Sequence, residues 1–242
     1  VLGIPCLIME FSVGRASQTS PINMYKKLEK PKQKWGGFGW VCLVGNISLM
    51  AFYTVVCGWL INYFVKFVSG NNQNMGFDKM TADPSVNVLF LLVTVVVSFF
   101  ILSFNLQGGL ERVTKYMMIA LLVLMVVLAV NSLMLGGAGE GMNFYLKPDF
   151  SKINGSVVVG AMNQAFFTLS TGMGGMAIFG SYIDKNRSLM GEAVSVISLD
   201  TLVAILAGVI IFPACFTYNL EVNAGPSLLF DTMATVFNNM EG

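Results

Sequence analysis

The sequence predicts an all-α polytopic membrane protein, and three observations support this fold class. Of the 242 residues, 55% are hydrophobic and only 11% are charged, whereas soluble domains carry roughly 25% charged residues. Uncharged apolar runs reach about 18 residues or more, the length that crosses the hydrocarbon core of a bilayer. Basic residues are concentrated in alternate loops between these runs. A soluble protein with a buried core explains none of these observations.

The first three expected spans lie in the N-terminal half. The stretch at about 1–13 is apolar from its first residue, and it is not a signal peptide because no basic region precedes it. Spans at about 40–68 and 86–104 follow, and the second of these contains the run SVNVLFLLVTVVVSFFILSF. Because the sequence opens inside an apolar run, we interpret it as a fragment of a longer protein.

The other three spans are expected at about 116–135, 157–183 and 193–216. The first of them is the uncharged run YMMIALLVLMVVLAVNSLML. Residues 217–242 carry Glu221, Asp231 and Glu241 and no basic residue, which predicts an outer loop. We expect the whole chain, 1–242, to form a single transmembrane domain.

Lysine and arginine set the expected orientation. The first loop, at about 14–39, carries six basic residues against one acid, Glu29. The third and fifth loops are also basic, whereas the second and fourth are balanced by acids. The positive-inside rule therefore predicts a multi-pass protein of the plasma (inner) membrane whose first loop is cytoplasmic. The net charge of +1 gives no indication of nucleic-acid binding.

The sequence contains no histidine. This excludes histidine bases, Ser-His-Asp triads and histidine metal sites. An intramembrane aspartyl protease needs two membrane aspartates, and only Asp200 lies in an expected span. We therefore do not expect an enzyme.

The stretch FFTLSTGMGGMAIFGSY, residues 166–182, is apolar at both ends and has small and polar residues at its centre. Glycine is about 1 kcal/mol less favourable than alanine in a helix. Close helix packing explains a pair of glycines, but it does not explain three glycines beside three hydroxyl residues. A helix that is broken near the middle of the membrane fits better. Irregular backbone at that depth survives only where it is buried or lines a cavity, and its free carbonyls and amides can bind a ligand.

Three further polar residues need a partner or a purpose inside the membrane. Asp200 is expected near the midplane, where it serves as a cation ligand or a proton carrier. Together with Thr168 it could offer oxygen ligands to sodium. Tyr53 is too deep for the interfacial aromatic belt, and a ligand carboxylate is one candidate partner for its hydroxyl. Glu10 lies five residues before Arg15, where a salt bridge or a helix cap is as consistent with the sequence as a functional role.

These residues resemble the neurotransmitter:sodium symporter family, which has the LeuT-type inverted-repeat fold. The resemblance covers nearly the whole chain and implies six of about twelve helices, the second to the seventh, one of them discontinuous. It rests on IPCLIMEFSVGR at Ile4–Arg15, Tyr53 followed by Trp59, NQAFFTLSTGMGGMAIFGSY at 163–182, and Asp200.

The resemblance implies a substrate site at the broken helix. Backbone carbonyls of Phe167 and Thr168, with Ser170, would hold the substrate amino group. Tyr53 would bind the substrate carboxylate, and Phe167 would also form a lid. The implied substrate-binding set is Leu49, Tyr53, Phe167, Thr168, Ser170 and Met173.

The resemblance also implies the ion site and the moving parts. Thr168 and Asp200 would bind sodium. Many relatives carry asparagine at position 200 and require chloride, so the aspartate here implies that chloride is not required. The implied hinge and gate residues are Gly172, Gly174, Gly175 and Tyr182.

The expected function is import of a neutral, hydrophobic amino acid together with sodium by alternating access. The flexible Met173, where some relatives carry phenylalanine, predicts a pocket that accepts several side chains. The alternatives are a non-transporting sensor or scaffold, and a LeuT-fold carrier of another small solute such as an osmolyte. The family's first and eighth helices have no counterpart in these residues, so we do not expect this stretch to transport by itself.

Overall fold

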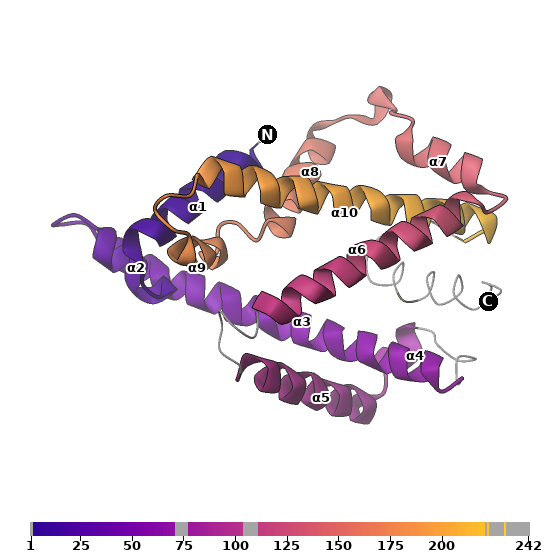
Figure 1. Ribbon diagram of the computed structural model, residues 1–242, viewed down its shortest axis with the longest axis horizontal. Coiled ribbons are helices and arrows are strands. Elements are labelled where there is room, and N and C mark those ends of the chain that lie inside the picture. The colour runs from indigo at the N-terminus through magenta and orange to yellow at the C-terminus, as the bar shows by residue number, and fades with distance from the viewer. Residues whose placement is uncertain (1, 71–76, 104–110, 221, 223–229, 231–242) are drawn as a thin grey trace. The chain divides into compact units, whose positions relative to one another are not determined.

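The computed structural model describes residues 2–70, 77–103, 111–220, 222 and 230. In this part of the chain all regular secondary structure is helical (Figure 1). The α-helices are α1 (Gly3–Ser17), α2 (Pro21–Leu28), α3 (Phe38–Val68), α4 (Phe77–Thr81), α5 (Pro84–Leu102), α6 (Glu111–Leu133), α7 (Ala138–Leu146), α8 (Gly155–Thr168), α9 (Gly175–Tyr182) and α10 (Leu189–Thr217). Two short 3-10 helices, η1 (Trp35–Gly37) and η3 (Phe150–Lys152), precede α3 and α8.

Among the described residues, four continuous helical segments are long and apolar enough to cross a membrane. The first expected span is the shorter helix α1, and the fifth is split into α8 and α9, so neither adds a continuous crossing to these four. The end of the expected span 86–104 and most of the expected outer loop 217–242 lie outside the described residues. The four segments are Trp35–Val68, Pro84–Leu102, Glu111–Leu133 and Leu189–Thr217.

Local sequence signals fix where two of the helices begin. The Asp83 carboxylate accepts hydrogen bonds from the backbone N–H groups of Ser85 (3.0 Å) and Val86 (3.3 Å) at the start of α5. Asn154 caps α8 in the same way, accepting from the Val157 N–H at 3.0 Å. Such caps satisfy amides that have no partner inside the helix, so each helix starts directly after its cap.

The chain forms two compact units, and α3 and α10 each contribute to both. The first unit comprises Val1–Ala51 and Asp149–Val203, and the second comprises Phe52–Pro148 and Ala204–Gly242. The stretch that is predicted to form the broken helix, residues 166–182, lies in the first unit together with Asp200.

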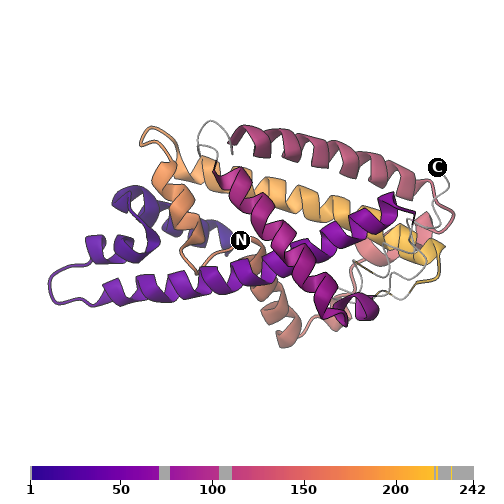
Figure 2. The same ribbon diagram turned by 90° about the horizontal axis from the view of Figure 1, so that it is seen from below.

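The first unit is built around α1 and α9, which lie side by side in Figures 1 and 2. Two glycines allow their backbones to meet. A Cβ atom at Gly180 would lie 2.6 Å from the Phe11 carbonyl oxygen, and one at Gly14 would collide with the Ala177 carbonyl oxygen. Next to this contact, α1 and the start of α10 form an apolar cluster. Its buried residues are Leu7, Phe11, Leu189 and Ala193.

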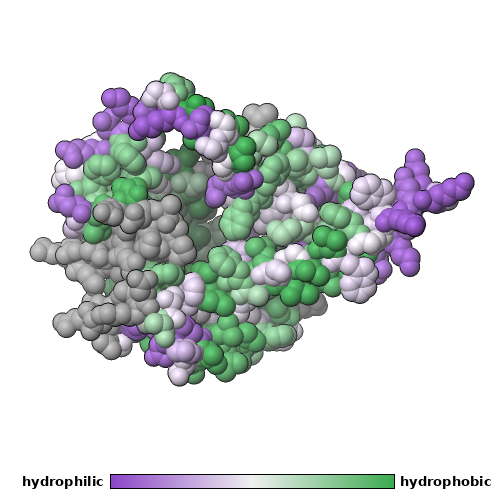
Figure 3. All heavy atoms as spheres, turned by 180° about the vertical axis from the view of Figure 1, so that it is seen from behind, coloured by the Kyte–Doolittle hydropathy of each residue, from purple (hydrophilic) through white to green (hydrophobic). Residues whose placement is uncertain are grey.

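The second unit has its own aromatic core and a largely apolar surface. Phe77 and Phe230 stack with their ring centres 5.3 Å apart, and the Trp59 indole N–H donates to the Asn87 side-chain oxygen at 3.0 Å, which ties α3 to α5. Large apolar side chains such as Phe99 and Val123 are exposed on α5 and α6. Apolar side chains also cover much of the face seen in Figure 3. Such surfaces are typical of contact with lipid, and the chain is a multi-pass membrane protein.

Candidate functional site

The helix predicted to be broken is interrupted in the structure. Helix α8 ends at Thr168 and α9 begins at Gly175. Between them the Thr171 N–H reaches back to the Phe166 carbonyl at 3.2 Å, a wider turn than that of an α-helix. The prediction of a discontinuous helix is confirmed, and its irregular residues are 169–174.

The backbone of the break passes through the left-handed region three times. The φ angles are 50° at Ser170, 96° at Gly172 and 70° at Gly174. Glycine adopts such angles without steric cost, which explains why glycines stand at two of these positions. Serine has a Cβ atom, so Ser170 holds a conformation that costs about 1 kcal/mol or more. The third predicted hinge glycine, Gly175, is instead the first residue of α9.

Glu10 satisfies one free amide of the break. Its Oε1 atom accepts a hydrogen bond from the Gly172 N–H, and the amides of Gly174 and Met176 also interact with this carboxylate. An anionic group is stabilised at the start of a helix, where N–H groups point outward. Glu10 therefore anchors α1 to the break and to the first turn of α9.

Asn46 satisfies a free carbonyl of the same break. Its Nδ2 atom donates to the Met173 carbonyl oxygen at 2.7 Å and to the Cys42 carbonyl oxygen at 2.8 Å. Irregular backbone inside a membrane protein needs such partners, because lipid offers none. The break is thus held from one side by α1 and from another by α3.

Thr168 and Asp200 meet as the sequence predicts. The Thr168 hydroxyl donates to Asp200 Oδ1 at 2.9 Å and joins the last residue of α8 to α10. The carbonyl groups that end α8 carry partial negative charge close to this pair. Hydroxyl, carboxylate and carbonyl oxygens are the ligands that hard cations prefer, so this end of α8 offers a suitable donor set for sodium.

The other predicted substrate residues are distributed around the break and along α3. Phe167 is 49% exposed, while Ser170 and Met173 are half-buried. Leu49 and Tyr53 lie one turn apart on α3 and therefore on the same face of that helix. Tyr53 belongs to the second compact unit, and its role stays a prediction. Tyr182, the predicted gate residue, is the exposed last residue of α9.

The structure does not support a salt bridge between Glu10 and Arg15, and it identifies Asn46 as a further residue of the site. No salt bridge joins Glu10 to Arg15 in the described residues; the Arg15 guanidinium instead donates to the Arg187 carbonyl oxygen at 2.8 Å. The sequence could have indicated a role for Asn46, because it is a polar residue inside an apolar span and such a residue normally requires a partner. Its partner could not be named without the fold.

Two polar atoms beside the break have no hydrogen-bond partner within the described part of the chain. They are Glu10 Oε2 and Thr171 Oγ1, and both are buried. Buried polar atoms of this kind normally bind a protein group, water or a ligand. The break is therefore polar enough to receive a further polar group.

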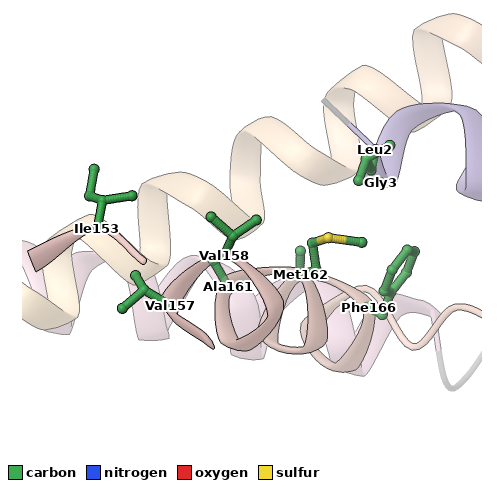
Figure 4. A pocket seen from close by; sticks show the side chains of 9 residues that line it. Leu2, Gly3, Ile153, Val157, Val158, Ala161, Met162 and Phe166 are labelled. Carbon is green, nitrogen blue, oxygen red and sulfur yellow. The ribbon is translucent and has the colours of Figure 1, made fainter. Parts of the chain in front are cut away.

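A separate groove of about 400 Å³ lies between α8 and the start of α1 (Figure 4). Its walls include Leu2, Val158, Met162 and Phe166, and every lining residue is apolar or glycine. An amino acid carries an ammonium and a carboxylate group, and burying these charges without partners is strongly unfavourable. This groove is consequently a poor substrate site, whereas the break offers polar partners.

Comparisons with known proteins agree on one family. The family model described as "Sodium:neurotransmitter symporter family" matches residues 73–224. The chain is 34% identical to an uncharacterized sodium-dependent transporter of Haemophilus influenzae, over 99% of this chain and 56% of that protein. It is also 34% identical to the uncharacterized sodium-dependent transporter YhdH of Bacillus subtilis, over 99% of this chain and 54% of that protein. The chain thus spans about half the length of these relatives.

A solved structure shows the same fold. The crystal structure of MhsT in complex with L-phenylalanine is similar with a TM-score of 0.88 and 35% sequence identity. The similarity covers 98% of this chain and 56% of the MhsT chain. The predicted LeuT-type fold is confirmed by this likeness.

Proposed function

Because this chain belongs to the sodium:neurotransmitter symporter family, we propose that the full-length polypeptide imports neutral, hydrophobic amino acids together with sodium. The observation that carries the proposal is the interrupted helix whose first half ends in the Thr168–Asp200 hydrogen bond of 2.9 Å. This arrangement combines exposed backbone dipoles with an acidic side chain, as a site for a zwitterion and a cation requires.

We assign the sodium ion to the end of α8. Thr168 would contribute its hydroxyl oxygen and Asp200 its carboxylate, with nearby carbonyl groups completing the shell. The two side chains hydrogen-bond to each other at 2.9 Å, so their oxygen atoms lie close together. Ion binding would replace this hydrogen bond by two oxygen–cation contacts.

We assign the substrate to the same break. The carbonyls of Phe167 and Thr168, with Ser170, would bind the ammonium group, and Tyr53 would bind the carboxylate. The side-chain pocket would be lined by Leu49, Phe167 and Met173. The similar protein MhsT has been crystallised with L-phenylalanine, which supports a hydrophobic amino acid as the substrate class.

Transport would require a change in the angle between α8 and α9. Gly172 and Gly174 have positive φ angles at this joint, so they can absorb backbone rotation that other residues resist. Together with Gly175 they would form the hinge, and Tyr182 would close the cytoplasmic side. Coupling then needs only a different affinity of sodium and substrate for the two states.

We propose that the first loop, at about 14–39, faces the cytoplasm. Its exposed lysines include Lys26, Lys30, Lys32 and Lys34. The Glu29 carboxylate, the one acid of the loop, accepts a hydrogen bond from the Gly36 N–H at 2.8 Å. The loop is therefore strongly basic, which favours the cytoplasmic side.

Uptake into proteoliposomes that contain the full-length polypeptide tests the proposed function. We expect radiolabelled leucine to accumulate under an inward sodium gradient and not under a matched choline gradient. Unlabelled methionine and tryptophan should compete, and an osmolyte such as betaine should not. Sodium-independent uptake, or competition by the osmolyte alone, would contradict the proposal; no uptake at all would favour a sensor or scaffold.

Removal of chloride gives a second prediction. The Asp200 carboxylate can supply the negative charge that balances bound sodium, so uptake should change less than about two-fold when gluconate replaces chloride. The measurement is the initial rate of leucine uptake at constant sodium. A rate that falls to the background level in gluconate would show that the aspartate does not replace the anion.

A further inference from the structure

Two adjacent residues of α3, Gly45 and Asn46, contact Met173 from the same side. Asn46 Nδ2 donates to the Met173 carbonyl oxygen at 2.7 Å. A Cβ atom built on Gly45 would lie 3.4 Å from both Cγ and Sδ of Met173. The Met173 backbone and side chain are therefore both set against α3, although Met173 belongs to the break between α8 and α9.

This contact limits a side chain that is otherwise adaptable. Methionine is unbranched and fills irregular space in several conformations. Here the missing side chain of Gly45 leaves room for the thioether to lie against α3. At the same time the Asn46 hydrogen bond fixes the peptide group from which that side chain projects.

We propose that Gly45 and Asn46 are specificity-determining residues, which set the size of the substrate pocket by fixing Met173. The proposal rests on the proposed function, in which Met173 lines the pocket. Neither residue needs to touch the substrate, so both are positioning residues. The ligand class that they would select is the larger hydrophobic amino acids, because a thioether held against α3 leaves more of the pocket open.

A purely structural role predicts a different result. If Gly45 and Asn46 only hold α3 against the break, their replacement weakens the binding of all substrates by the same factor. If they position Met173, the ratio of affinities for large and small substrates changes. This ratio is measured on one sample, so a loss of folded protein does not alter it.

The first variants are Gly45→Ala and Gly45→Val. An alanine methyl group reaches ordinary contact distance from Met173, so Gly45→Ala should change the ratio little. The larger valine must displace the thioether from α3 into the pocket. We expect Gly45→Val to weaken tryptophan relative to valine as a ligand by roughly ten-fold or more, since small changes in a hydrophobic pocket discriminate by about that factor.

The second variant, Asn46→Leu, has the same number of side-chain heavy atoms and the same branching but no donor. It leaves the Met173 carbonyl without its partner from α3, so Met173 is free to move. We expect Asn46→Leu alone to weaken tryptophan relative to valine, but by less than Gly45→Val does, because Met173 gains freedom without being displaced into the pocket. In the double variant the effect of Gly45→Val should shrink by at least about three-fold, because residues that act through one shared contact are not additive.

The measurement is competition of tryptophan and valine against radiolabelled leucine on the purified full-length polypeptide in sodium. Gly160→Val on α8 is the matched control, since nothing lies within 4 Å of a Cβ atom at Gly160. A wild-type protein that binds none of the amino acids overturns the proposed function and this inference with it. Wild-type binding with an unchanged ratio in Gly45→Val, or fully additive effects in the double variant, overturns only the inference.

Discussion

Replacement of Asp200 by alanine is expected to raise the sodium concentration for half-maximal uptake at least ten-fold. The carboxylate is half-buried and lies 2.9 Å from the Thr168 hydroxyl, so its removal deletes both an oxygen ligand and the negative charge beside the cation. Loss even of a group that only orients a metal ligand typically costs about 10- to 100-fold in affinity. The measurement is the sodium dependence of initial leucine uptake, with the amount of membrane protein determined on the same samples.

Two matched variants separate ion binding from general damage. Glu192→Ala removes an acid from the first turn of the same helix, where Glu192 pairs with Arg187 at 3.3 Å near the surface. Such exposed pairs contribute little, so its sodium dependence should stay within about two-fold of wild type. Asp200→Asn keeps an oxygen but loses the charge, and uptake should then require chloride. An unchanged sodium dependence in Asp200→Ala would rule out the ion assignment.

Replacement of Gly180 by alanine is expected to have the largest effect on stability. The added Cβ atom would lie 2.6 Å from the carbonyl oxygen and 2.7 Å from the Cα atom of Phe11. These are backbone atoms of a buried residue, so no side chain can rotate away and α1 must move. Overpacking of this kind costs about 1–3 kcal/mol, which corresponds to roughly 2–12 °C in the unfolding temperature of a chain of this size.

Thermal unfolding of the detergent-solubilised protein, followed by size-exclusion chromatography, measures this effect. Gly160→Ala is the control, because a methyl group there meets no atom within 4 Å and alanine is the better helix former. Gly14→Ala should resemble Gly180→Ala, since its Cβ atom would meet the Ala177 carbonyl from the other side of the contact. Equal unfolding temperatures in Gly180→Ala and Gly160→Ala would show that α1 and α9 do not pack as described.

The contact between α1 and α9 at Gly180 also affects the helix break between α8 and α9. Glu10 precedes Phe11 on α1 and accepts the hydrogen bond from the Gly172 N–H. Movement of α1 away from α9 would therefore also withdraw the carboxylate from the break. We expect Gly180→Ala to lose uptake even at temperatures where it stays folded.

The sequence alone was sufficient for the features that depend on local composition. Hydropathy and charge predict the membrane class, because crossing the bilayer requires long apolar helices whatever their neighbours. The cluster of Ser170, Gly172 and Gly174 predicts the break, because these residues disfavour a helix where they stand. The meeting of Thr168 with Asp200 was implied by the resemblance to the symporter family rather than by composition, and the two side chains do hydrogen-bond to each other.

Only the tertiary structure decided which groups hold the break together. Glu10 finds its partner 162 residues away at Gly172, and Asn46 finds its partner 127 residues away at Met173. In the sequence Glu10 lies five residues before Arg15, so a local salt bridge was as consistent with the sequence as a contact with a distant group. The physical reason is that a polar side chain in a membrane must be satisfied, but the helix that satisfies it is chosen by packing. Here Gly14 and Gly180 bring α1 against α9, and that approach places Glu10 at the break.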